Sequence, residues 1–265
     1  MRIARFASGD EPQYGVVELA EDGGAHPDTV SVLTGDPLVG PVQLTGERRE
    51  LEAVRLLAPV IPRSKIVGVG RNYAEHAAEL GNEVPATPLT FLKPNTAVIG
   101  PGEPIVYPPI TSDLHFEGEL AVVIGRICKE VPAERAREVI FGFTVANDVT
   151  ARDLQRSDGQ WSRAKGSDTF CPLGPWITTH QTLPEVGDLA LRTTLDGHER
   201  QSASTRDMVH GVADLVVFVS AFTTLLPGDV ILTGTPAGVG PMEPGQEVSV
   251  SIEGIGTLTN PITRA

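Results

Sequence analysis

One apolar stretch that carries two carboxylates constrains the fold of this chain most. Residues 112–126 have the sequence SDLHFEGELAVVIGR, in which Phe116 and residues 120–124 are apolar and several are β-branched. This pattern predicts a β-strand. Side chains alternate across a strand, so Glu117 and Glu119 share one face, with their Cα atoms about 6.6 Å apart. Since the other positions on both faces are apolar, we expect a strand that is buried on both sides.

Two carboxylates held close together in a buried place raise each other's pKa, and a bound cation reverses that effect. Asp148 ends a second apolar stretch, FTVAND, and brings the number of candidate ligands to three. An all-oxygen set suits Mg²⁺, Mn²⁺ or Ca²⁺ better than zinc. The pattern leaves another interpretation open, in which Glu117 and Glu119 lie on an exposed edge strand and Asp148 is solvated.

The composition excludes several classes of partner. The 21 Lys and Arg residues against 34 Asp and Glu residues give a net charge of −13, and there is no basic run. We therefore expect no nucleic-acid and no membrane partner, and an anionic substrate would need a locally positive site. The chain has two distant cysteines, no signal-peptide pattern and no apolar run long enough to span a bilayer, which predicts a cytoplasmic protein.

The chain divides into two regions by pattern. Residues 1–58 form a small N-terminal module with short strand patterns, and residues 59–265 form the larger region. With 28 Gly and 22 Pro, the fold is predicted to be α+β and mainly β. Thr150 and Asp153 match a helix-capping pattern, and Asp196-Gly197 is typical of a hairpin turn.

Two groups of polar residues lie on predicted helices. Arg152 and Gln155 are three residues apart and share a face; with Lys165 they could bind an anion beside the carboxylates. His76 and Glu79 have the same spacing, and a carboxylate that orients an imidazole makes a general base near neutral pH. An ordinary solvated helix surface is the alternative interpretation of both patterns, and for His76 and Glu79 taken alone it is the favoured one.

Six collinear stretches between Ile66 and Ile262 resemble the fumarylacetoacetate hydrolase superfamily. They are GVGRNYAEHAAE, FLKPNTAVIGPGEPI, HFEGELAVVIG, GFTVANDVTARDLQ, AKGSDTFCPLGPW and LLPGDVILTGTPAGVG. The chain is most similar to bacterial members of the 2-hydroxyhepta-2,4-diene-1,7-dioate isomerase and acylpyruvate hydrolase type. The resemblance implies a mixed β-sandwich roll of the C-terminal-domain type, behind a short N-terminal module, and a homodimer.

The resemblance also implies the roles of individual residues. Glu117, Glu119 and Asp148 would hold Mg²⁺ or Mn²⁺, with Ca²⁺ in some members. The catalytic residues would be His76 and Glu79, in a mobile lid, and Lys165. The residues implied to bind substrate are Arg152, Gln155, Thr235, Arg71 and Tyr73.

Members of the superfamily act on small anionic 2-oxo or 2-hydroxy dicarboxylates through a metal-bound enolate. The resemblance implies either hydrolysis of a C–C bond in acylpyruvate-type compounds or isomerisation of 2-hydroxyhepta-2,4-diene-1,7-dioate, in the catabolism of aromatic compounds. Oxaloacetate decarboxylation is an alternative. A non-catalytic protein that binds small acids through a metal is another, but it would have no use for Lys165, His76 and Glu79 together.

Overall fold

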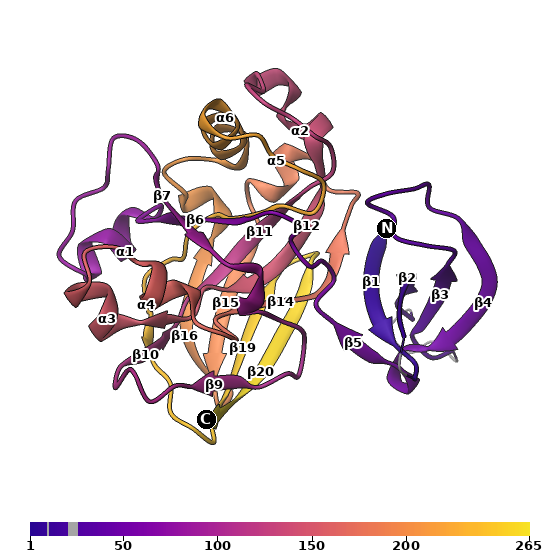
Figure 1. The fold of residues 1–265 in the computed structure, drawn as a ribbon, viewed down its shortest axis with the longest axis horizontal. Coiled ribbons are helices and arrows are strands. Elements are labelled where there is room, and N and C mark those ends of the chain that lie inside the picture. The colour runs from indigo at the N-terminus through magenta and orange to yellow at the C-terminus, as the bar shows by residue number, and fades with distance from the viewer. Residues whose placement is uncertain (10, 21–25) are drawn as a thin grey trace.

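The first five strands form a small module beside a larger body (Figure 1). The computed structural model describes residues 1–9, 11–20 and 26–265. In the described part, the module consists of β1 (Arg2–Ala7), β2 (Pro12–Glu18), β3 (Thr29–Leu33), β4 (Leu44–Glu50) and β5 (Arg55–Leu57). All of these strands pair antiparallel, in the order β4-β3-β2-β1, with β5 on β1.

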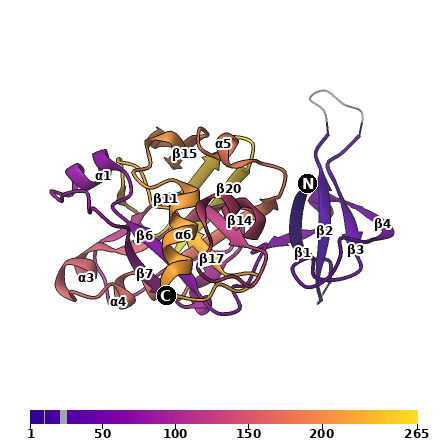
Figure 2. The ribbon, with the colours of Figure 1, turned by 90° about the horizontal axis from the view of Figure 1, so that it is seen from above.

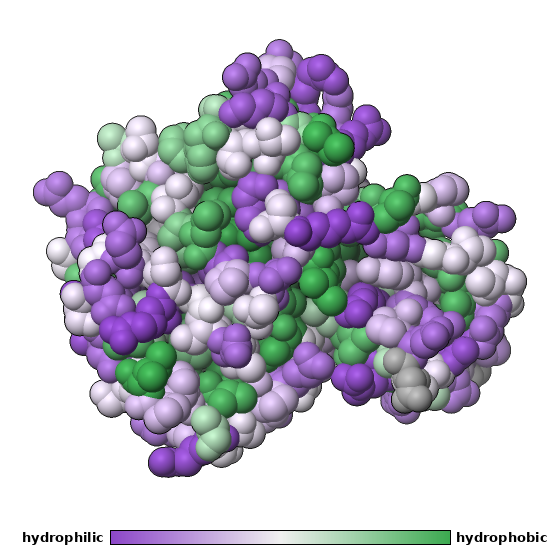
Figure 3. All heavy atoms as spheres, viewed as in Figure 1, coloured by the Kyte–Doolittle hydropathy of each residue, from purple (hydrophilic) through white to green (hydrophobic). Residues whose placement is uncertain are grey.

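The module is joined to the body through both hydrogen bonds and packing. β1 pairs with β14 (Cys171–Thr178), and Ile3 and Leu33 pack in one hydrophobic cluster with Leu173 and Ile177. In the view of Figure 3, hydrophobic residues gather along the junction of the two parts.

The larger body is built from two sheets that pack face to face. The module's sheet continues through the order β14-β12-β11-β17-β6-β7, in which β17 and β6 run parallel. The second sheet has the order β16-β15-β19-β20-β9. The strands of the body besides β14 are β6 (Ile66–Gly70), β7 (Leu89–Lys93), β8 (Val98–Ile99), β9 (Ile105–Tyr107), β10 (Leu114–Phe116), β11 (Gly118–Ile124), β12 (Ile140–Asn147), β13 (Thr150–Ala151), β15 (Ala190–Leu195), β16 (His198–Ser204), β17 (Val230–Leu232), β18 (Gly240–Pro241), β19 (Glu247–Ile252) and β20 (Gly256–Arg264).

The main core lies between these two sheets. It joins Leu120 and Phe143 of the first sheet to Leu191 and Val250 of the second, all buried. Burial of apolar side chains on this scale is the main force that holds such layers together. The prediction of a mainly β, mixed sandwich is confirmed.

Short helices lie at two ends of the body (Figures 1 and 2). One group, near β6, β7 and β10, consists of α1 (Ala74–Glu79), α3 (Arg152–Ser157) and α4 (Ser162–Gly166). The other consists of α2 (Ala136–Val139), α5 (Leu183–Val186) and α6 (Val212–Phe222). Within the described residues, none of the helices combines the length and the apolar character that crossing a bilayer requires.

The strand expected over residues 112–126 is interrupted at Glu117. The Glu117 N–H is bonded to the side chain of Asn147 (2.9 Å) rather than to a backbone carbonyl, so β10 and β11 are separate strands. Gly118 starts β11 in a place where a Cβ atom would lie 2.3 Å from Thr193 Oγ1. The expected burial is confirmed, because every residue of β11 is buried.

The expected helix cap at Thr150 is wrong. Thr150 belongs to β13, and its hydroxyl donates to the carbonyl oxygen of Asp148 (2.8 Å), whereas helix α3 begins at Arg152 without a side-chain cap. Asp153 instead accepts hydrogen bonds from Thr111 and Ser112. The pairing of β13 with β10 therefore overrides the local capping pattern.

Candidate active site

Three buried carboxylates converge at the end of β11 and β12. Glu117 and Glu119 flank Gly118, which pairs with Asn147, the residue before Asp148. One oxygen from each of the three carboxylates can be chosen so that all lie within 4.8 Å of one another. The spacing of Glu117 and Glu119 about Gly118 and the antiparallel register of β11 with β12 thus produce the acidic cluster that the sequence pattern indicated, and all three carboxylates are buried.

Cationic side chains hold two of these carboxylates. Lys165, from α4, donates to Glu117 Oε2 and to Asp148 Oδ2, both at 2.6 Å. Arg152, the first residue of α3, donates to Glu117 Oε1 at 2.6 Å. Lys93, at the end of β7, forms an ion pair with the other oxygen of Asp148 and is completely enclosed. Glu117 and Asp148 are therefore compensated by charges within the protein.

Glu119 differs from the other two carboxylates. It accepts a hydrogen bond from the Gly234 N–H at 2.7 Å, and within the described residues no cationic side chain pairs with it. Burial raises the pKa of Glu119 well above its ordinary value, and the charges of Asp148 and Glu117 raise it further. Burial acts on Glu117 in the same direction, but Lys165 and Arg152 outweigh it and lower the pKa of that group.

This donor set can hold a divalent cation. Carboxylate oxygens are the ligands that Mg²⁺, Mn²⁺ and Ca²⁺ prefer, and sulfur and imidazole are not part of the cluster. Within the described residues, Glu119 is the carboxylate of the cluster that no cationic side chain pairs with. A divalent cation beside it would therefore offset the repulsion from Asp148 and Glu117. Two observations support the fit of a divalent cation: the position of Glu119 and the convergence of three buried carboxylates.

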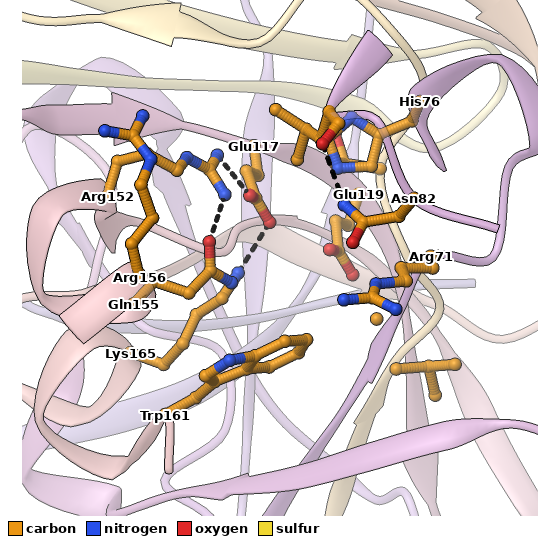
Figure 4. A pocket seen from close by; sticks show the side chains of 14 residues that line it. Arg71, His76, Asn82, Glu117, Glu119, Arg152, Gln155, Arg156, Trp161 and Lys165 are labelled. Atoms are coloured by element: carbon orange, nitrogen blue, oxygen red, sulfur yellow. Dashed lines mark hydrogen bonds and ion pairs between the residues drawn. The ribbon is translucent and has the colours of Figure 1, made fainter. Parts of the chain in front are cut away.

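A cavity of about 360 Å³ opens beside the acidic cluster (Figure 4). Of the predicted site residues, those that line it are Arg71, His76, Glu117, Glu119, Arg152, Gln155, Lys165 and Thr235. Arg152 donates to Gln155 Oε1 at 2.6 Å, which confirms that the two side chains share a face of α3. The cavity wall is locally positive in a strongly acidic protein, as an anionic substrate requires.

His76 and Glu79 lie together on helix α1 at the edge of this cavity. His76 Nδ1 is 3.3 Å from Glu79 Oε2, and the side chain of His76 is buried. The Gly238 N–H donates to both oxygens of Glu79 at 3.1 and 3.2 Å. These hydrogen bonds connect helix α1 to the loop that follows β17. Because His76 Nδ1 faces Glu79, Nε2 is the ring nitrogen left to act as a proton acceptor.

Thr235 reaches the cavity from the same loop, but its hydroxyl proton is already used. The hydroxyl donates to the Gly118 carbonyl at 2.9 Å and accepts from Gln201 Nε2 at 2.8 Å. Fully buried Gln201 also binds the Pro236 carbonyl (2.9 Å) and the Gly118 N–H (3.0 Å). Gln201 thus ties this loop to the strand that carries the glutamates.

Tyr73 is the predicted substrate-binding residue that does not line the cavity. It is buried, and its hydroxyl has no hydrogen-bond partner in the described part of the chain. Burial raises the pKa of Tyr73, and the nearby charge of Glu119 adds to that effect. Arg71, two residues earlier, does line the cavity and has a positive φ of 58°.

Sequence reasoning missed four residues that complete this region: Lys93, Arg156, Trp161 and Gln201. Lys93 belongs to the stretch FLKP, but nothing in that stretch indicates a partner. Arg156 and Trp161 line the cavity, and the Trp161 ring lies 5.4 Å from the ring of Phe91 in an edge-to-face arrangement.

Comparison with known proteins places this site in a family. The model for the fumarylacetoacetate (FAA) hydrolase C-terminal domain matches residues 65–263, and a model described as Rv2993c-like, N-terminal, matches residues 1–59. The structure of 5-carboxymethyl-2-hydroxymuconate delta-isomerase from Mycobacterium smegmatis is 51% identical, with a TM-score of 0.90 and coverage of 100% of both chains.

Two further relatives carry functional names. The mitochondrial oxaloacetate tautomerase Fahd2a of Rattus norvegicus is 37% identical over 291 residues, covering 99% of this chain and 91% of the relative. Fumarylpyruvate hydrolase from Pseudomonas aeruginosa, solved with Mn²⁺ and pyruvate, is 34% identical with a TM-score of 0.73, covering 77% of this chain and 91% of the other. This chain belongs to the fumarylacetoacetate hydrolase family and is an enzyme of that family.

Proposed function

We propose that this enzyme forms the enolate of a 2-oxo or 2-hydroxy dicarboxylate with the help of Mg²⁺ or Mn²⁺. We further propose that the overall reaction is isomerisation of a 2-hydroxy-2,4-diene dioate. The observation that carries the proposal is Glu119, a buried carboxylate with no cationic partner in the described part of the chain, in an all-oxygen cluster that opens on a positive cavity. The names of the isomerase and the tautomerase support it, because both describe the movement of a proton and a double bond.

A divalent cation, when bound, would supply positive charge to the oxygen on which the enolate charge develops. Lys165 and Arg152 would orient the substrate carboxylate, since their ion pairs with Glu117 and Asp148 hold both side chains in place. His76, oriented by Glu79, would accept a proton from one atom of the conjugated chain and return it to another. The double bond moves and the atoms of substrate and product are the same.

Hydrolysis of an acylpyruvate is the second candidate, and a specific observation favours it as well. His76, which lines the same cavity and contacts Glu79, could instead take a proton from water, which then attacks the distal carbonyl group. The C–C bond breaks, one fragment leaves as a carboxylic acid, and the other leaves as the enolate that is protonated to pyruvate. The name of the Pseudomonas hydrolase and its bound pyruvate agree with this reaction.

Exchange of deuterium at C3 of a 2-oxo acid tests enolate formation separately from the final reaction. Proton NMR in D₂O with pyruvate or 2-oxoadipate and Mg²⁺ should show enzyme-dependent loss of the C3 signal, and EDTA should abolish the effect. Isomerisation of a 2-hydroxymuconate-type dioate would then be followed by ultraviolet absorbance. Absence of exchange with every 2-oxo acid, in an enzyme saturated with Mg²⁺, would exclude the proposed step.

The proposal includes a cytoplasmic homodimer. Light scattering on the purified enzyme would give a mass of about twice 28.1 kDa if the homodimer forms. A mass equal to that of a single chain at micromolar concentration would contradict this part.

A further inference from the structure

The cavity is lined by more cationic side chains than those that pair with the carboxylates of the acidic cluster. It is lined by four cationic side chains, Arg71, Arg152, Arg156 and Lys165. Arg152 and Lys165 are bonded to the cluster carboxylates. Within the described residues, Arg71 and Arg156 donate no hydrogen bond to a carboxylate, and the ion pair of Arg156 with Asp113 is long, at 3.4 Å. Exposed pairs of this length contribute little, so Arg156 is free to bind an anion.

Helix α3 places Arg156 at the outer end of the cavity. Arg152 is 2% exposed beside the acidic cluster, whereas the Arg156 side chain is 67% exposed. The two residues are four apart and share a side of the helix, which separates their Cα atoms by about 6 Å along the axis. Figure 4 shows both guanidinium groups on the same side of the cavity, with Arg71 on the opposite side near Asn82.

The indole ring of Trp161 forms a wall of the same cavity (Figure 4). Its position is fixed from two sides. The ring packs edge-to-face on Phe91, and it lies so close to Gly70 that a Cβ atom there would be 2.7 Å from Trp161 Cζ3. A rigid aromatic wall favours a flat, conjugated carbon chain over a compact one.

We propose that Arg156 recognises a second carboxylate at the far end of a six- or seven-carbon 2-oxo or 2-hydroxy dioate whose chain lies along Trp161. This inference rests on the proposed function, since it assumes that the first carboxylate lies at the acidic cluster. With each carboxylate bound in the same way by its arginine, the Cα offset of about 6 Å along helix α3 corresponds to the distance between the ends of an extended six-carbon chain. The ends of the four-carbon chain of oxaloacetate are only about 4 Å apart, which fits this offset less well.

Calorimetric binding of two ligands of equal length tests the inference without turnover. 2-Oxoadipate and 2-oxohexanoate both have six carbons and share the 2-oxo acid end, but 2-oxoadipate alone has the distal carboxylate. With Mg²⁺ present, the native enzyme should bind 2-oxoadipate at least about tenfold more tightly, the size expected for one charge-assisted hydrogen bond. Arg156→Gln should remove this preference.

A matched control is available on the neighbouring helix. Arg163, on α4, pairs with Asp158 at 2.7 Å and does not line the cavity, so Arg163→Gln should leave the preference unchanged. Equal affinity of the native enzyme for both ligands, or binding of neither, would overturn the proposal. So would a preference that Arg156→Gln keeps and Arg71→Gln loses. A clear preference for 2-oxoadipate in an enzyme that catalyses no C3 exchange would instead refute the proposed function. It would still support recognition of the second carboxylate by Arg156.

Discussion

Replacing Glu119 with Gln should stabilise the metal-free enzyme. Glutamine keeps the size of the side chain and an oxygen that can accept the Gly234 N–H, but it removes the charge. At a separation of 4.8 Å, two like charges repel by about 3.5 kcal/mol at an effective dielectric constant of about 20. Glu119 has two such neighbours, and the cations bound to them offset most of that repulsion. We therefore expect Glu119→Gln to gain about 1–3 kcal/mol in EDTA.

The pH dependence of this gain follows from the direction of the pKa shift. Because the pKa of Glu119 is raised in the folded protein, ionisation favours the unfolded chain, and native stability is lost as the pH rises from the unfolded value of about 4.3 towards the folded value. The free energy of unfolding of the variant should therefore equal that of the native enzyme near pH 4 and exceed it at neutral pH.

Urea unfolding in EDTA measures the stability that Glu119→Gln gains without metal. Urea unfolding with Mn²⁺ or Mg²⁺ measures the stabilisation by a bound cation. A ligand at a hundred times its dissociation constant stabilises the native state by about 2.7 kcal/mol, and we expect the native enzyme to gain this while Glu119→Gln gains little. Glu117→Gln is the matched control. It removes the carboxylate charge that pairs with Arg152 and leaves Lys165 with Asp148 alone, so it should destabilise the protein by about 3–5 kcal/mol. A Glu119→Gln protein less stable than the native enzyme in EDTA would refute the reasoning.

Three further predictions concern the residues around the cluster. Gln201→Leu should lower the free energy of unfolding by about 2–4 kcal/mol, since it leaves the Gly118 N–H and the Pro236 carbonyl buried without partners; a loss below 1 kcal/mol in urea would contradict this. His76→Ala should lower kcat/KM by about 10²–10⁴, and an activity within threefold of the native value would exclude His76 as the base. Gly238→Ala should weaken the Glu79 contact, because φ is +95° and a Cβ atom would lie 2.1 Å from the Arg200 carbonyl oxygen; kcat should fall in parallel with Glu79→Gln, and an unchanged kcat would show that the contact is dispensable.

The acidic cluster could be predicted because its geometry is local. A spacing of two residues in extended backbone is enough to bring Glu117 and Glu119 together, and the apolar residues around them indicated burial. The same reasoning missed the break at Glu117, which depends on the Asn147 side chain from the neighbouring strand. The Thr150 cap failed for a related reason, because a strand pairing with β10 competes with the helix for that residue.

No local sequence pattern identified Gln201 or Lys93, because both side chains bind residues that are far away in the chain. Gln201 lies in the second sheet, 83 residues from Gly118, and its role depends on how the two sheets pack. Lys93 reaches Asp148 across 55 residues because β7 pairs with β6 at the edge of the first sheet. Neither contact has a period or a spacing that the sequence displays, so both required the structure.

The turnover of 2-oxo and 2-hydroxy acids with and without a divalent cation tests the central claim most directly. Purified enzyme would be given a 2-hydroxymuconate-type dioate, fumarylpyruvate, acetylpyruvate and oxaloacetate, each with Mg²⁺ or Mn²⁺ and each with EDTA. Our account predicts turnover of a six- or seven-carbon dioate that EDTA abolishes and added cation restores. Turnover that EDTA does not affect, or cation-dependent binding of these acids without conversion of any of them, would contradict it.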